Sequence, residues 1–191
     1  MVSATNWKKS FLYLLLATYF SENTKIMRNF LWLLALPLIW ACQAPLNQVV
    51  STANLSFEGD MLFEGPNTLS TENTIMLSNL AEENGLETSQ IASIGVSSAV
   101  LKIAESGLPI TESLLLQITS NNHELITLGT LSPLPADQKS FKLELAEEID
   151  LLPYFGDEGC TWVLDFNLNS EHMDTYQSKA KIDLTLNYEE K

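Results

Sequence analysis

Strict alternation of apolar and polar residues near the C-terminus constrains the fold of this chain more than any other feature. Ile182, Leu184 and Leu186 alternate with charged or polar neighbours. Successive side chains of a β-strand point to opposite faces, so this pattern predicts a strand with one buried and one solvated face. Such strands are typical of antiparallel sheets, because parallel strands are covered on both faces.

Similar strand patterns recur along the chain, in segments bounded by turn-forming residues. We expect seven or eight strands, drawn from residues 53–57, 61–63, 91–104, 113–119, 124–131, 141–145, 162–168 and 182–188. Gly65-Pro66-Asn67 is expected to end the second of these. Asn121-Asn122-His123 is expected to turn a hairpin between the fourth and fifth.

One segment, residues 71–84, has helical rather than strand periodicity. Its apolar residues fall roughly on one side of a helix, Thr71 or Asn73 is placed to cap it, and Gly85 is placed to end it. Together the patterns predict a mainly β protein, an antiparallel β-sandwich of Greek-key or immunoglobulin-like type with one short helix. We expect a single domain over residues 51–191.

Two apolar segments precede this domain, Phe11–Phe20 and Phe30–Ala41. A bilayer core about 30 Å thick needs roughly 20 apolar residues in a helix, and neither segment is that long. Polar and charged residues at positions 21–25 separate them. The lengths and flanks favour a cleaved signal segment over a membrane-spanning helix.

The second apolar segment ends in Ile39-Trp40-Ala41-Cys42, after the positive Met27-Arg28-Asn29. This resembles a bacterial lipoprotein signal peptide with its lipobox, although Trp40 stands where the family usually has a small residue. The resemblance implies cleavage after Ala41 and lipidation of Cys42. Residues 27–41 would then be the signal peptide, residues 42–50 a tether, and residues 1–26 an upstream extension or mis-assigned start. A buried hydrophobic helix with an ordinary core cysteine is the alternative.

The charges of the chain are strongly segregated. The formal net charge is −14, and residues 1–41 carry +3, so residues 42–191 carry −17 from 6 lysines, no arginine and 23 acids. A surface this acidic repels phosphate backbones, so we expect no nucleic-acid partner. The acidity favours simple solvation of an envelope protein. A surface that binds cations or a basic partner is the alternative.

Residues 165–174 form the one segment with a metal-binding pattern. Asp165, Asn167, Asn169 and Asp174 resemble the oxygen ligands of a calcium loop, but Ser170 and Tyr176 stand where that loop has glycine and glutamate. A strand followed by a polar turn is the interpretation we favour. We therefore expect no metal and no cofactor.

The other chemically capable residues are expected to be structural or solvated. His123 and His172 are expected in exposed turns, and Cys160, at the start of an apolar strand, is expected to be buried. The acids Glu147, Glu148 and Asp150 are adjacent in the sequence, and such acids rarely converge across a cleft as glycoside hydrolysis requires.

Two segments resemble bacterial envelope β-sandwich proteins that have no assigned chemistry. They are Asp150-Leu-Leu-Pro-Tyr154, placed like a short turn before a late strand, and residues 91–103. The resemblance covers about a third of the chain after Cys42.

These observations predict a lipid-anchored protein of the bacterial cell envelope, non-enzymatic, acting as a structural or interaction module. Gln43 lacks the Asp that family precedent links to inner-membrane retention, so the outer membrane is the expected location. The expected partners are the membrane, through the N-terminal lipid, and an envelope protein or ligand. One alternative is a sandwich that binds an apolar or glycan ligand through exposed Tyr154, Phe155 or Trp162. Another is a hydrolase that uses Asp165, Glu171 or His172.

Overall fold

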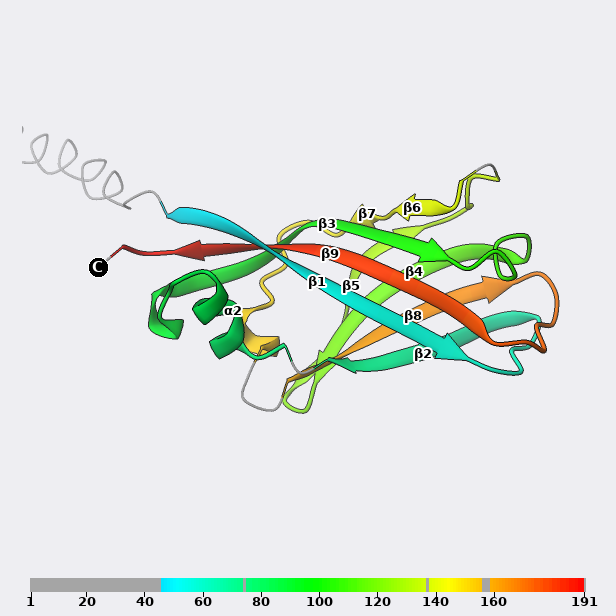
Figure 1. The fold of residues 1–191 in the computed structure, drawn as a ribbon, viewed down its shortest axis with the longest axis horizontal. Coiled ribbons are helices and arrows are strands. Elements are labelled where there is room, and N and C mark those ends of the chain that lie inside the picture. The colour runs from blue at the N-terminus through cyan, green and yellow to red at the C-terminus, as the bar shows by residue number, and fades with distance from the viewer. Residues whose placement is uncertain (1–45, 74, 137, 156–158, 191) are drawn as a thin grey trace, which may run out of the picture. The chain divides into compact units, whose positions relative to one another are not determined.

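The alternating segments form the strands of two antiparallel sheets, so the predicted β-sandwich is confirmed (Figure 1). The computed structural model describes residues 46–73, 75–136, 138–155 and 159–190. The first sheet has the order β1 (Asn47–Gly59), β9 (Tyr176–Tyr188), β3 (Ile91–Ile103), β6 (Ser140–Lys142). The second has the order β2 (Gly65–Asn73), β8 (Cys160–Leu168), β4 (Thr111–Ser120), β5 (His123–Leu131), β7 (Glu144–Leu145).

The strand pairs are nested, and this nesting defines the topology. The first strand pairs with the last, β2 with β8, β3 with β6 and β4 with β5. The chain passes from one sheet to the other after β1, β2, β3, β5, β6 and β8. This is the double Greek key of a jelly roll, and it differs from the immunoglobulin order of strands.

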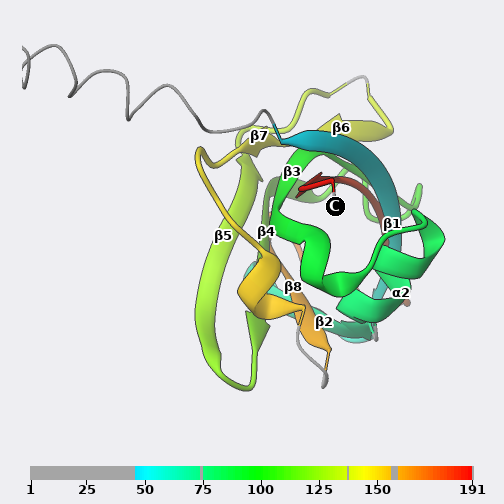
Figure 2. The ribbon, with the colours of Figure 1, turned by 90° about the vertical axis from the view of Figure 1, so that its left-hand side faces the viewer.

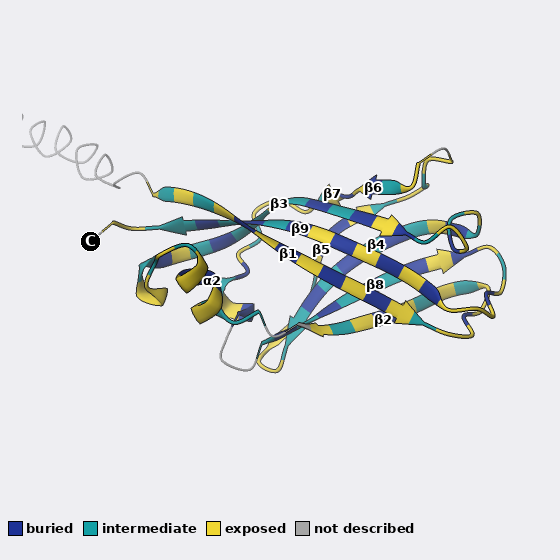
Figure 3. Cartoon of the chain, viewed as in Figure 1, coloured by how far each residue is buried: buried dark blue, intermediate teal, exposed yellow. Residues whose placement is uncertain are grey.

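The core lies between the two sheets and is built chiefly by alternate residues of the central strands (Figure 3). In β9, every second side chain from Tyr176 to Leu186 is buried. In β8 the same holds from Cys160 to Leu168. The largest fully buried side chains include Trp162, Tyr176, Phe57, Phe141 and Phe155. The predicted one-face burial of these strands is therefore confirmed.

Strand β2 was missed by the sequence patterns, which assigned a break at Gly65-Pro66-Asn67 and a helix from residue 71. Among its side chains at positions 65–72, only that of Leu69 is buried, because β2 lies at the edge of its sheet and pairs with β8 alone. An edge strand tolerates Pro66, since the missing N–H leaves no ladder bond unmade on the outer side. The strand expected at residues 61–63 is also wrong: only Leu62 forms a bridge there.

Two predicted boundaries also differ from the structure. The tether expected over residues 42–50 overlaps β1, because Asn47–Val50 pair with Tyr188–Thr185 at the far end of β9. The helix α2 runs from Leu77 to Glu83, without a side-chain cap at Met76. Its end at Gly85 is as expected: the residue has φ +68°, the left-handed conformation that glycine adopts freely.

The Asp-Leu-x-Pro-Tyr segment forms a 3-10 turn, η2 (Leu152–Tyr154), at the same end of the sheets as α2 (Figure 2). The carboxylate of Asp150 accepts hydrogen bonds from the N–H groups of Ile94 (2.9 Å) and Leu152 (3.0 Å). Leu151 and Phe155 are fully buried, and the Tyr154 hydroxyl donates to the Glu124 carbonyl. These contacts hold the turn against β3 and β5, and Asp150 therefore has a structural role.

Replacing Asp150 with alanine is expected to destabilise the protein by about 1–2 kcal/mol, because two backbone N–H groups lose a charged acceptor. Asp150→Asn keeps an acceptor oxygen and is expected to lose less. Chemical denaturation followed by tryptophan fluorescence measures both changes. The exposed Glu147→Ala is the matched control, and a loss for it equal to that of Asp150→Ala would contradict the assignment.

Candidate interaction surface at the loop end

Four connections meet at the end of the sandwich opposite the start of β1 (Figure 1). They join β1 to β2, β3 to β4, β5 to β6, and β8 to β9. The register places Asn47 beside Tyr188 at one end and Gly59 beside Tyr176 at the other. We call the end with these connections the loop end.

Tyr176 forms the base of the loop end. Its ring stacks on Phe166, with centroids 4.6 Å apart, and His172 meets it edge-on at 6.0 Å. Its hydroxyl lies 3.1 Å from that of Thr111, which donates to the Gly107 carbonyl. A Cβ at Gly107 would lie 2.6 Å from the Tyr176 ring, so only glycine fits there. The connections of the loop end are thus tied to a packed aromatic cluster.

Three large apolar side chains are exposed at the loop end. They belong to Met61, Phe63 and Met173, and their exposed fractions are 66%, 67% and 62%. Between them, Leu62 and His172 form a bridge with two backbone hydrogen bonds of 2.9 Å, and both of those side chains are buried. The bridge brings the connection after β1 against the connection after β8. We call Met61, Phe63 and Met173 the tip patch.

The backbone that carries the tip patch is held by several specific contacts. The side-chain amide of Asn67 donates to the carbonyls of Phe63 (2.8 Å) and Gly65 (3.0 Å), and its oxygen accepts the Phe63 N–H. Met61 has φ +54°, a conformation that few residues other than glycine adopt. A bulky residue in that conformation persists only where the surroundings impose it, and such positions concentrate at functional sites.

Acidic residues flank the members of the tip patch in the sequence. Asp60, Glu64, Glu171 and Asp174 lie within one or two positions of its members, and all four are exposed. The two connections, residues 60–64 and 169–175, contain no lysine or arginine. We call these four acids the rim; with no lysine or arginine beside them, they make both connections negative.

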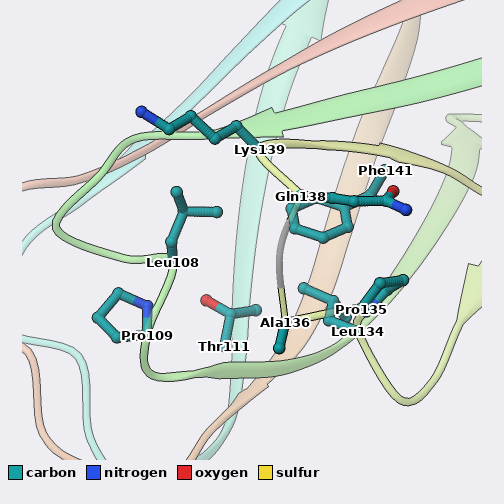
Figure 4. Close-up of a pocket in the computed structure, with 9 residues that line it drawn as sticks. All are labelled: Leu108, Pro109, Thr111, Leu134, Pro135, Ala136, Gln138, Lys139 and Phe141. Carbon is teal, nitrogen blue, oxygen red and sulfur yellow. The ribbon is translucent and has the colours of Figure 1, made fainter.

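A pocket of about 510 Å³ lies between the β3–β4 and β5–β6 connections (Figure 4). Leu108 and Pro109 stand on one side, and Leu134, Pro135 and Ala136 on the other. Two of its polar side chains, those of Thr111 and Lys139, already have partners. The Thr111 hydroxyl bonds within the protein, and Lys139 pairs with Glu105.

The calcium-like residues lie on a strand and the turn after it, so the strand interpretation of residues 165–168 is confirmed. Asp165 and Asn167 belong to β8, and the Asp165 carboxylate accepts a hydrogen bond from the Thr68 hydroxyl. Asn169 and Asp174 follow in the β8–β9 connection. Within the described ranges, no group of three or more His, Cys, Asp or Glu is placed to hold a metal ion.

Other residues singled out from the sequence lie in the core. Tyr154, Phe155 and Trp162 are buried, which removes the alternative of a binding patch formed by these aromatic side chains. His172 is buried as well, contrary to expectation: its backbone bridges to Leu62 and its ring packs edge-on against Tyr176. His123 is exposed, as expected. Cys160 is buried as expected, and burial raises the pKa of its thiol to about 11.

The expected cleavage and lipidation residues, Ala41 and Cys42, lie outside the described residues. Among the residues that the structure describes, no helix has the length and apolar character needed to span a bilayer. The sequence patterns did not find the tip patch, because they assigned Met61-Leu62-Phe63 to a strand. The available signal was an apolar triplet between two acids, Asp60 and Glu64, within a glycine-bounded turn.

Tyr176 is expected to make the stability of the fold sensitive to alkali. Burial raises the pKa of its phenol from 10 to about 12. The neutral form is thus favoured in the folded state, and this contribution is complete below pH 10 and lost as the pH rises toward 12. The difference corresponds to about 3 kcal/mol.

The test is denaturant unfolding at intervals from pH 8 to 12, with wild type and Tyr176→Phe. The variant is expected to lose less stability between pH 10 and 12 than wild type. Some alkaline loss remains in both, because the buried Cys160 thiol also ionises there at the expense of folding. Equal losses in the two proteins would contradict the role given to Tyr176.

No family model and no curated protein matches the chain. Solved structures similar to it include Desmodium yellow mottle tymovirus, at 9% identity over 76% of this chain and 91% of that chain, with a TM-score of 0.32. The capsid of Helicobacter pylori bacteriophage KHP30 has 10% identity, coverages of 74% and 92%, and a TM-score of 0.33. The Yersinia pseudotuberculosis-derived mitogen has 10% identity, coverages of 73% and 86%, and a TM-score of 0.27. Likenesses of this size carry no argument about what the chain does.

Proposed function

We propose that this protein is a lipid-anchored, non-enzymatic interaction module of the bacterial cell envelope, held through Cys42 in the outer membrane. The observation that carries the proposal is the direction of β1. Four residues, 43–46, separate Cys42 from the first residue of this strand. A lipid at Cys42 would thus hold the Asn47 end of the sandwich near the membrane surface.

The length of β1 would then present the loop end away from the membrane. Its 13 residues, at about 3.3 Å each, span roughly 43 Å. The connections at the loop end carry the tip patch and the pocket, and connections on a rigid scaffold are where binding residues concentrate. The geometry favours a protein that is anchored at one end and makes contacts at the other.

The non-enzymatic part of the proposal rests on how the chemically capable residues are used. The Asp150 carboxylate accepts hydrogen bonds from two backbone N–H groups, and the Asp165 carboxylate accepts one from the Thr68 hydroxyl. His172 is buried behind the bridge with Leu62. These contacts give Asp165 and His172, two of the three residues considered for a hydrolase, structural roles; the third, Glu171, is exposed.

The mass of the intact protein tests the anchor. After expression of the full chain in a bacterial host, wild type is expected to have the mass of residues 42–191 plus diacylglycerol and acyl chains. Cys42→Ser is expected to lack this modification, because lipid transfer needs the thiol. A wild-type N-terminus without lipid would overturn the proposal.

Binding of a small apolar molecule is a second candidate function, favoured by the pocket between Leu108 and Leu134. Its volume lies within the range of about 300–1,000 Å³ typical of ligand sites. Leu134→Trp would fill the pocket and is expected to abolish any thermal stabilisation that a panel of apolar ligands produces. The distant Leu125→Trp variant is the control and is expected to keep the stabilisation. If Leu134→Trp keeps it as well, the pocket is excluded as the site.

A further inference from the structure

We propose that the tip patch is a docking surface for a basic protein segment that carries apolar side chains. The proposal specifies the partner of the interaction module inferred above and rests on that role, but it does not need the lipid at Cys42. It is argued from the exposure of Met61, Phe63 and Met173, the rigidity of their backbone, and the charges around them.

The three side chains of the tip patch expose apolar surface to water. Each side chain leaves about two thirds of its surface in water, while the adjacent Leu62 and His172 are buried. Single exposed apolar residues are common, but a group of large ones in a polar rim marks an interaction site. Methionine and phenylalanine are also enriched in protein interfaces.

The tip patch is preorganised for contact. The bridge between Leu62 and His172 fixes the two connections to each other, and Asn67 holds the backbone of Phe63 on both its N–H and its carbonyl. A binding surface that is already ordered loses little conformational entropy on association. Phe63, with two side-chain torsions, is well suited to be the anchor of the contact.

The surrounding charges decide which occupant fits. Asp60, Glu64, Glu171 and Asp174 form a negative rim without a neighbouring lysine or arginine in either connection. A second copy of the chain would bring two such rims together, and anionic lipid headgroups would meet the same repulsion. Lysine or arginine side chains on a partner would instead pair with the rim while its apolar residues cover the tip patch.

The test uses the full chain in phosphatidylcholine nanodiscs, with empty discs as the blank. The probes are fluorescent peptides of lysine and leucine, one with helical and one with alternating periodicity, and twins with glutamate in place of lysine. Fluorescence anisotropy gives the dissociation constants. At least one lysine peptide is expected to bind wild type, and the glutamate twins are expected not to bind.

The decisive variant is Met61→Ser/Phe63→Ser/Met173→Ser, with Phe63→Ser alone as a milder form should the triple variant fail to fold. Affinity is expected to fall by about tenfold or more in the triple variant, since the apolar anchors are lost. The matched control is Val50→Ser/Leu125→Ser, which removes exposed apolar side chains away from the loop end. It is expected to bind like wild type.

A rim variant, Asp60→Asn/Glu64→Gln/Glu171→Gln/Asp174→Asn, separates the charge from the apolar contact. It is expected to weaken binding at low salt and to approach wild type at high salt, because exposed charges are screened there. All these proteins share one N-terminus, so the comparison stands whether or not Cys42 is lipidated. If Cys42 is not lipidated, the mass spectrum shows it and the binding comparison does not change. If the tip patch does not bind basic segments, only the binding experiment shows it.

Four outcomes would overturn the proposal. In the first, neither lysine peptide binds wild type. In the second, the triple variant binds as tightly as wild type, which would assign the attraction to overall charge. In the third, glutamate twins bind equally well. In the fourth, wild type without peptide self-associates or binds phosphatidylglycerol vesicles and the triple variant does not, which would assign the tip patch to a second copy or to lipid.

Discussion

The pairing of β8 and β9 on both of their sides is the constraint on which the rest of the structure depends. β9 lies between β1 and β3 in one sheet, and β8 between β2 and β4 in the other. Their inner faces meet as the centre of the core, with Trp162 on one and Tyr176 on the other. Because β8 and β9 follow the other strands in the sequence, β1 and β2 pair with segments that are distant in the chain, which makes the fold rich in non-local contacts.

The same pairing explains why the loop end can carry exposed apolar groups. Tyr176 opens β9 and stacks on Phe166 of β8, so the rigid centre of the core reaches the base of the connections. The bridge between Leu62 and His172 then joins the connection after β1 to the connection after β8. The tip patch is therefore held by the fold, while its own side chains contribute little to the core. That division suits a surface whose apolar groups are kept for a partner.

The departures from the sequence-based expectations have a common physical reason. Where a strand had two neighbours and a buried face, as in β4, β8 and β9, its alternation was plain and its prediction was confirmed. β2 has one neighbour and, over positions 65–72, a single buried side chain, Leu69, so local residues carried almost no signal. His172 looked like a turn residue, since the bridge that buries it joins segments that are far apart in the chain. The tip patch was missed because Met61-Leu62-Phe63 was assigned to a strand, and because the bridge that brings Met173 near this segment is not visible in the sequence.

The sequence by itself determined the class of fold and the distribution of charge. Apolar residues at every second position lie on one face only in a β-strand, so this pattern indicates a sheet. The net charge is the sum of the residue charges whatever their positions. Tertiary structure alone decided the nesting of the strands and the use of Asp150 as a backbone acceptor. It also brought together, through the bridge between Leu62 and His172, the two connections that carry the exposed Met61, Phe63 and Met173. These depend on contacts between distant segments, and strand register and pairing order, which bring such segments together, are not encoded in any local pattern.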